Sequence, residues 1–116
     1  MLNPSYCTLP ASNCSADDEI TKVTFGSLTN ASSGCSGAGY TDYTTTVAAP
    51  VFPPGTVANI SVNVGPGSDD NAGVWIDFNR NGIFEPSEYT FIGYTNSTIE
   101  STLIKSITIP ANANLG

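Results

Sequence analysis

The sequence predicts an all-β protein, an antiparallel β-sandwich of roughly seven to eight strands with a jelly-roll or immunoglobulin-like topology. Two observations carry this prediction. Short runs of alternating or β-branched residues are separated by clusters of Gly, Pro, Asn and Ser, and the chain contains 11 Gly and 8 Pro. No stretch keeps a helical period over successive turns. Because 116 residues make one ordinary domain, we expect a single sandwich over residues 1–116.

Two strands are predicted from strict alternation. In "TVANISVNV", residues 56–64, every second residue is apolar, which is typical of a half-buried strand. In "GVWIDFN", residues 73–79, the apolar residues Val74, Ile76 and Phe78 alternate with Trp75 and Asp77. Because both faces of this second run carry large or functional side chains, we expect it to lie in the centre of a sheet.

The remaining strands are expected in four β-rich runs, at residues 19–28, 40–48, 88–95 and 101–109. The segment "APVFPPG", residues 49–55, is expected to be a turn or crossover, because Pro cannot donate a hydrogen bond within a central ladder.

Charge and composition restrict the partners and the location. The net charge is −7, and the basic residues number only 3, namely Lys22, Arg80 and Lys105. Such a chain has no patch that could neutralise phosphates, which excludes nucleic acid and an anionic membrane surface as partners. No apolar run reaches the length of a transmembrane helix, so no membrane insertion is expected. The weakly charged composition, rich in Thr, Ser, Asn and Gly, is typical of a secreted or cell-surface β-protein.

The three cysteines, Cys7, Cys14 and Cys35, lie in the first third of the chain. We predict a Cys14–Cys35 disulfide, because both residues lie in loop-like segments on either side of an expected strand. It would stabilise the fold by roughly 3 kcal/mol. Cys7 is then either a free thiol or paired with another part of the parent protein. The alternative is a cytosolic protein with three reduced cysteines.

The stretch "DFNRNGIFEPSE", residues 77–88, matches the calcium-loop pattern D-x-[DN]-x-[DN]-G-x5-E at every constrained position. Calcium needs side-chain oxygens at positions 1, 3 and 5, a Gly at 6, a backbone carbonyl at 7 and a carboxylate at 12. The predicted cofactor is therefore calcium, and its predicted ligands are Asp77, Asn79, Asn81, the carbonyl of Ile83, Glu85 and Glu88.

The flanking structure differs from that of an EF-hand, because a strand enters the loop and Pro86 interrupts any helix that would follow it. Only three of the ligands are carboxylates, which predicts a weak site with a dissociation constant of about 10⁻⁴ to 10⁻³ M. The alternative interpretation is a hairpin without metal, because "NRNG" alone is good turn chemistry.

Three more acidic residues are candidates for metal binding. Asp69 and Asp70, in "GSDDNAG", precede the expected strand 73–79 and would either extend the metal site or form a solvated turn. Asp42, in "GYTDYT", would support either the metal or the fold through hydrogen bonds.

The aromatic residues offer a candidate binding platform. Trp75 is the only Trp and lies on the Asp77 face of its strand; the residues that would join it are Tyr40, Tyr43, Tyr89 and Tyr94. Aromatic rings beside calcium are suited to holding sugar rings. The alternative is that Trp75 packs between the sheets, as the Trp of a sandwich commonly does. Catalysis is not expected, because the chain has no His and its best carboxylates are already assigned to the loop.

Several motifs together resemble the GEVED domain, a module of secreted multidomain proteins of Bacteroidetes. They are "YC" at 6–7, "ITKVTFGSLTNASSGCSG" at 20–37, "GYTDYT" at 39–44, "VWIDFNRNGIFE" at 74–85 and "ITIPANANLG" at 107–116. The resemblance implies an all-β, non-catalytic, bacterial module attached to secreted peptidases, carbohydrate-active enzymes or large surface proteins. It places the family's acidic loop on Asp77, Asn79, Asn81, Gly82 and Glu88.

Two departures from the family pattern matter. Asn81 and Ile83 stand where the family usually has acidic residues, which predicts weaker metal binding. The family pattern also continues beyond Gly116, so we expect that a last strand is missing and that an edge is open to pairing.

These observations predict a non-catalytic, calcium-stabilised accessory module of a secreted or cell-surface protein. It would act in targeting or adhesion by binding a polysaccharide or an extracellular matrix protein, beside the other domains of its parent protein. The alternative is a structural spacer whose only ligand is calcium.

Overall fold

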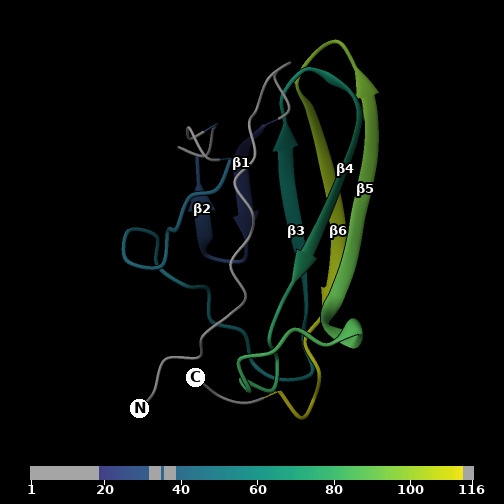
Figure 1. The fold of residues 1–116 in the computed structure, drawn as a ribbon. Helices are drawn as coiled ribbons and strands as arrows, with labels where there is room; N and C mark the ends of the chain where they lie inside the picture. Colours follow the sequence, from purple (N-terminus) through teal and green to yellow (C-terminus); the bar gives the residue numbers. More distant parts are fainter. Residues whose placement is uncertain (1–18, 32–34, 36–38, 114–116) are drawn as a thin grey trace.

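The computed structural model describes residues 19–31, 35 and 39–113, and this part of the chain is all-β and antiparallel (Figure 1). Its elements are β1 (Ile20–Phe25), β2 (Leu28–Asn30), β3 (Val57–Val64), β4 (Gly67–Trp75), the 3₁₀ turn η1 (Pro86–Glu88), β5 (Tyr89–Ser97) and β6 (Ser101–Thr108). One sheet has the order β2-β1-β3-β6, and β4 pairs with β5 in a two-stranded ribbon. Within the described residues, we find no helix with the length and hydrophobicity of a membrane span.

Strand β3 forms where the alternating pattern predicts it and lies inside the four-stranded sheet. It pairs with β6 without interruption from Val57↔Thr108 to Val64↔Ser101. Its other neighbour is β1, with pairs such as Phe25↔Ile60. The apolar side of its pleat provides Ile60, Val62 and Val64, all buried.

The hairpin between β1 and β2 depends on Gly26. This residue has φ +58°, and with Ser27 it forms a two-residue turn between the paired residues Phe25 and Leu28. A Cβ at position 26 would lie 2.5 Å from the ring of Phe52. Glycine is therefore required both by the backbone conformation and by the close approach of that ring.

The two sheets share one hydrophobic core. In Figure 1, the β4–β5 ribbon runs along the four-stranded sheet, and β5 lies beside β6. The four-stranded sheet provides five of the buried core residues, and the ribbon provides Ala72 and Ile92. The five are Phe25, Ile60, Val62, Val64 and Ile107, and Ile109, directly after β6, completes the core. The all-β, antiparallel prediction is confirmed, although the six strands of the described residues are fewer than the seven to eight expected.

The strand expected at 73–79 differs from the observed one in its bounds and its place. Strand β4 covers Gly67–Trp75, and in the described residues it has only β5 as a partner, so it is not central. The chain leaves the strand before Asp77, because the Asp77 carboxylate accepts backbone hydrogen bonds from the loop that follows. The segment "GSDDNAG" is part of β4 and not a turn, since it pairs with β5 through Asp70↔Thr95 and Asn71↔Tyr94.

The strand expected at 40–48 does not form. Asp42 Oδ1 accepts the Thr44 N–H at 2.9 Å, and the Tyr43 carbonyl accepts the N–H groups of Thr46 and Val47. These local bonds satisfy the backbone as a turn, which removes the donors that a ladder would need. The segment 49–55 is a loop, as its prolines predict.

Candidate functional site

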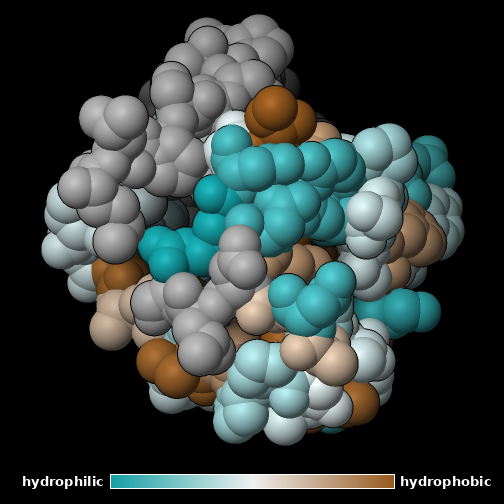
Figure 2. All heavy atoms as spheres, turned by 90° about the horizontal axis from the view of Figure 1, so that it is seen from below, coloured by the Kyte–Doolittle hydropathy of each residue, from teal (hydrophilic) through white to brown (hydrophobic). Residues whose placement is uncertain are grey.

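The predicted metal loop connects β4 to β5 at one end of the molecule, at the bottom of Figure 1. Its base is closed by the Ile76 N–H, which donates to the Glu88 carbonyl at 3.1 Å. Viewed from this end, the molecule presents a large hydrophilic patch with hydrophobic groups around it (Figure 2).

The first half of the loop curls around the Asp77 carboxylate. Its Oδ1 accepts the Asn81 N–H at 3.2 Å, and its Oδ2 accepts the Gly82 N–H at 2.9 Å. Gly82 has φ +82°, the conformation for which a Gly is required at the sixth position of a calcium loop. The turn that the sequence predicts is therefore present, and it is formed by Asp77, Asn81 and Gly82.

The side chains of Asn79 and Asn81 also accept hydrogen bonds from backbone N–H groups of the loop. Asn79 Oδ1 accepts the Asn81 N–H at 2.9 Å, and Asn81 Oδ1 accepts the Ile83 N–H at 2.8 Å. Each is a side-chain turn of the kind that Asn forms readily. Arg80, which lies between them with φ +59°, is exposed.

The Glu88 carboxylate joins the two halves of the loop. Only 6% of this residue is exposed. Its Oε1 accepts the Phe78 N–H at 3.0 Å, and its Oε2 accepts the Glu85 N–H at 3.1 Å. These charge-assisted bonds attach the end of the loop to its beginning.

The Glu85 carboxylate faces the two Asn side chains. Its Oε2 accepts a hydrogen bond from Asn79 Nδ2 at 3.0 Å, and its Oε1 accepts one from Asn81 Nδ2. The Asn81 amide is the main reason that the pKa of Glu85 lies below its ordinary value. The carboxylate charge is thus stabilised by amide donors from two other predicted ligands.

The chemistry of this donor set fits calcium, because carboxylate, amide and carbonyl oxygens are the ligands that a hard cation prefers. Each carboxylate oxygen that accepts one N–H retains another lone pair for a metal. Within residues 19–31, 35 and 39–113, however, no three acidic, His or Cys side chains gather closely enough to form a metal cluster by themselves. The loop would need its Asn and carbonyl oxygens to bind calcium, as the sequence pattern predicts.

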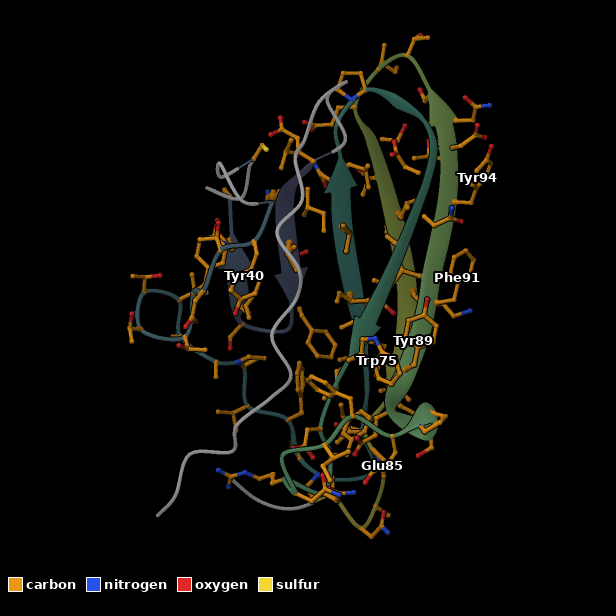
Figure 3. All side chains as sticks on the ribbon, in the orientation of Figure 1. Tyr40, Trp75, Glu85, Tyr89, Phe91 and Tyr94 are labelled. Atoms are coloured by element: carbon orange, nitrogen blue, oxygen red, sulfur yellow. The ribbon has the colours of Figure 1, made fainter. Side chains whose placement is uncertain are left out.

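The structure does not bring the other metal candidates to this loop. Asp69 and Asp70 lie near the start of β4, and Asp70 is separated from Trp75 by five residues of strand, about 17 Å. Asp42 lies with Tyr40 beside β1 and β2, where the backbone N–H of Thr44 lowers its pKa. Figure 3 shows Tyr40 far from Glu85.

A second candidate site is the outer face of the β4–β5 ribbon, which we call the ribbon face. Four aromatic side chains project from it and are about half exposed: Trp75 (45%), Tyr89 (43%), Phe91 (48%) and Tyr94 (50%). Figure 3 shows them in a row along the ribbon. The exposure of Trp75 contradicts the alternative in which this residue packs between the sheets.

Trp75 is the centre of a small ring cluster at the loop end of the ribbon face. Its ring centroid lies 4.9 Å from that of Tyr89, its partner across the ribbon. It lies 5.8 Å from that of Phe84, which belongs to the metal loop. Both ring pairs are tilted, in the range of favourable aromatic contacts. The cluster therefore connects the predicted metal loop with the ribbon face.

A β-bulge brings Tyr94 to the same face as Tyr89 and Phe91. The pairing passes from Gly73↔Phe91 to Ala72↔Gly93, so Ile92 is the extra residue, and it is buried. Without this bulge, the alternation of the pleat would place Tyr94 on the opposite face from Phe91.

Glycine at position 73 makes room for the Tyr89 ring. A Cβ on Gly73 would lie 2.5 Å from Tyr89 Oη and 2.6 Å from its ring. The ring of Tyr89 therefore lies over the backbone of β4, which a larger residue at position 73 would prevent.

The other end of the ribbon face is polar. Tyr94 Oη donates a hydrogen bond of 2.6 Å to Asp69 Oδ1, and this bond is the main reason that the pKa of Tyr94 lies above its ordinary value. Asn71 and Asn96 are also exposed on β4 and β5. The ribbon face thus combines aromatic rings with hydrogen-bonding groups.

The predicted five-residue platform is divided by the structure. Trp75, Tyr89 and Tyr94 share the ribbon face, whereas Tyr40 and Tyr43 line a groove of about 700 Å³ against β1 and β2. Sequence reasoning missed Phe91 and Phe84. Side chains on one face of a strand recur every second residue, so Phe91 could have been placed beside Tyr89. No signal in the sequence places Phe84 against Trp75.

The predicted disulfide stays a prediction. Cys14 lies outside the described residues, as does Cys7. Cys35 is described, and its N–H donates to Glu19 Oε2 at 2.7 Å, near the start of β1.

Comparison with known families finds a match to part of the chain. Residues 71–116 match the family model of the GEVED domain, and this segment includes most of β4, the metal loop, β5 and β6. The resemblance recognised in the sequence is confirmed over that segment. No curated protein and no solved structure matches the chain.

Proposed function

We propose that this chain, whose residues 71–116 are of the GEVED type, is a non-catalytic accessory module that binds a neutral polysaccharide on the ribbon face. The observation that carries the proposal is the row of four half-exposed aromatic side chains on one face. Aromatic side chains of this size have surfaces of about 150–250 Å² each, so the four expose roughly 370 Å² together. A patch of this area on a monomer is commonly functional.

The shape and chemistry of the ribbon face favour a polysaccharide as the ligand. The face is an open ribbon and not a concave pocket, so it suits a long chain better than a small molecule. The rings can pack against the C–H faces of sugars, while the Tyr94–Asp69 pair and Asn71 offer hydrogen bonds to hydroxyl groups. The net charge of −7 disfavours an anionic polymer.

Calcium is proposed as a structural ligand of the loop 77–88. The side chains of Asp77, Asn79, Asn81, Glu85 and Glu88 and the carbonyl of Ile83 would hold it. Bound there, the ion would cross-link a loop that is already curled by its own hydrogen bonds. The support is the donor chemistry and the spacing of the ligands.

The remaining expectations belong to the same proposal. We propose that the two sheets form a jelly-roll or immunoglobulin-like sandwich, because they share one core. A secreted or cell-surface location in a bacterium, beside other domains, is supported by the weakly charged composition and by the GEVED match. The absence of His from the sequence supports a role without catalysis.

A structural spacer is the second candidate function. It is favoured by the contacts of Trp75 with Phe84 and Tyr89, which give this ring a role in holding the loop against the ribbon. A spacer would require the ring cluster for stability but would bind no polysaccharide.

Affinity electrophoresis tests the proposal. The protein is run in native gels that contain hydroxyethylcellulose, xylan, galactomannan or laminarin, with calcium present. We expect retardation by at least one polymer, lost in Trp75→Ala and Phe91→Ala. The matched control is Tyr40→Ala, which removes an aromatic side chain that is 57% exposed but lies off the ribbon face. Folded protein that no polymer retards would favour the spacer.

A further inference from the structure

We propose that Phe84 couples the metal loop to the ribbon face, so that calcium and polysaccharide each strengthen the binding of the other. This inference rests on the proposed function, because it needs both ligands. It goes beyond the proposed function by assigning a role to Phe84, which is neither a proposed calcium ligand nor one of the four aromatic residues of the row.

The position of Phe84 in the chain ties it to the metal site. Its neighbours are Ile83, whose carbonyl is a proposed ligand, and Glu85, whose carboxylate is another. The Ile83 N–H is held by Asn81 Oδ1 at 2.8 Å, and the Glu85 N–H is held by Glu88 Oε2 at 3.1 Å. The backbone on both sides of Phe84 is therefore fixed by side chains that would bind the ion.

The Phe84 ring connects the metal loop to the ribbon face, because it contacts the Trp75 ring. Its centroid lies 5.8 Å from that of Trp75, and the Trp75 centroid lies 4.9 Å from that of Tyr89. Trp75 and Tyr89 face each other at the last pair of the ribbon, where the loop begins and ends. Three rings thus form a continuous contact from the loop to the aromatic row.

This contact predicts positive coupling, in which each ligand raises the affinity for the other. An ion that fixes the curled loop also fixes Phe84 against Trp75, so the ribbon face loses less conformational freedom when it binds a polymer. A tilted aromatic pair contributes enough to change an equilibrium by about 2- to 13-fold. We therefore expect calcium to raise polysaccharide affinity by a factor in this range. Because binding equilibria are linked, saturating polysaccharide raises calcium affinity by the same factor.

Trp75 provides a direct readout, because it is the only Trp of the chain. Calcium is titrated into the metal-free protein while Trp fluorescence is recorded, and thermal unfolding is measured at the same calcium concentrations. In the wild type, we expect the fluorescence change to give the same calcium dissociation constant as the stabilisation. In Phe84→Leu, which keeps an apolar side chain but removes the ring, we expect the stabilisation to persist and the fluorescence change to be lost. Tyr40→Leu is the matched control, since it removes an exposed aromatic ring that lies off the ribbon face.

The second arm measures affinity for the polysaccharide that retards the wild type most, in calcium and in EDTA. We expect the ratio of the two affinities to lie between about 2 and 13 in the wild type and in Tyr40→Leu, and to approach 1 in Phe84→Leu. The coupling would be wrong if calcium stabilised the protein but left the Trp fluorescence unchanged, or if the polysaccharide affinity were equal in calcium and in EDTA. Neither result would contradict the two proposed binding sites. No calcium stabilisation, or no polysaccharide binding in either condition, would overturn the corresponding part of the proposed function and the coupling with it.

Discussion

Replacing the buried Glu88 with Gln should destabilise the protein even when no metal is present. Glu88 is 6% exposed, and its two carboxylate oxygens accept the N–H groups of Phe78 and Glu85 at 3.0 and 3.1 Å. In Glu88→Gln, one oxygen becomes an NH₂ group that faces an N–H donor, and the other bond loses its charge. A hydrogen bond to a charged group contributes about 1.5–3 kcal/mol, so we expect a loss of about 2–3 kcal/mol in the free energy of unfolding.

The assay is thermal unfolding in EDTA, followed by circular dichroism. For a domain of this size, 1 kcal/mol corresponds to about 4 °C in Tm, so we expect Tm to fall by roughly 8–12 °C. The matched control is Glu100→Gln. Its exposed carboxylate also accepts two hydrogen bonds, but these come from the side chains of Thr21 and Asn63. If both variants lower Tm by the same small amount, the Glu88 carboxylate does not hold the loop together.

Three further predictions concern the ribbon face. Gly73→Ala should displace the Tyr89 ring and weaken polysaccharide retardation in native gels while the protein stays folded; unchanged retardation would mean that the ring position is unimportant. The pKa of Tyr94 lies above 10.0, so its bond to Asp69 is present below pH 10 and is lost as the pH rises through that raised value. An ultraviolet titration should therefore lose the tyrosinate step of Tyr94 in Tyr94→Phe, and Asp69→Asn should move that step to lower pH. Hydroxyethylcellulose should retard the protein more than carboxymethylcellulose, which has the same backbone with anionic groups; stronger retardation by the anionic polymer would contradict a neutral ligand.

The sequence predicts best what depends on neighbours in the chain. The strand 56–64 follows from alternation, and its core face is buried as expected. The loop 77–88 follows from side chains that bond to backbone groups a few residues away, such as Asp77 with Gly82. Both are local patterns that a single stretch of sequence specifies.

Features that depend on strand pairing were missed or misplaced. The bulge at Ile92 brings Tyr94 beside Phe91, but the residues alone do not indicate which of them lacks a partner across the ribbon. The exposure of Trp75 depends on which face of the ribbon the other sheet covers. A turn at Asp42 forms in place of the expected strand. The Asp42 side chain accepts the Thr44 N–H, which is then not available for hydrogen bonds between strands. The sequence does not indicate which strand would have been the partner.

Binding of polysaccharide to the ribbon face can be mapped by amide NMR. Spectra are recorded during titration with soluble oligosaccharides of the polymer that retards the protein in gels. We expect the largest shifts in β4 and β5, around Gly73, Trp75 and Phe91, and at the indole N–H of Trp75. Shifts confined to residues 39–50 would place the ligand in the groove lined by Tyr40 and Tyr43 and would contradict binding on the ribbon face.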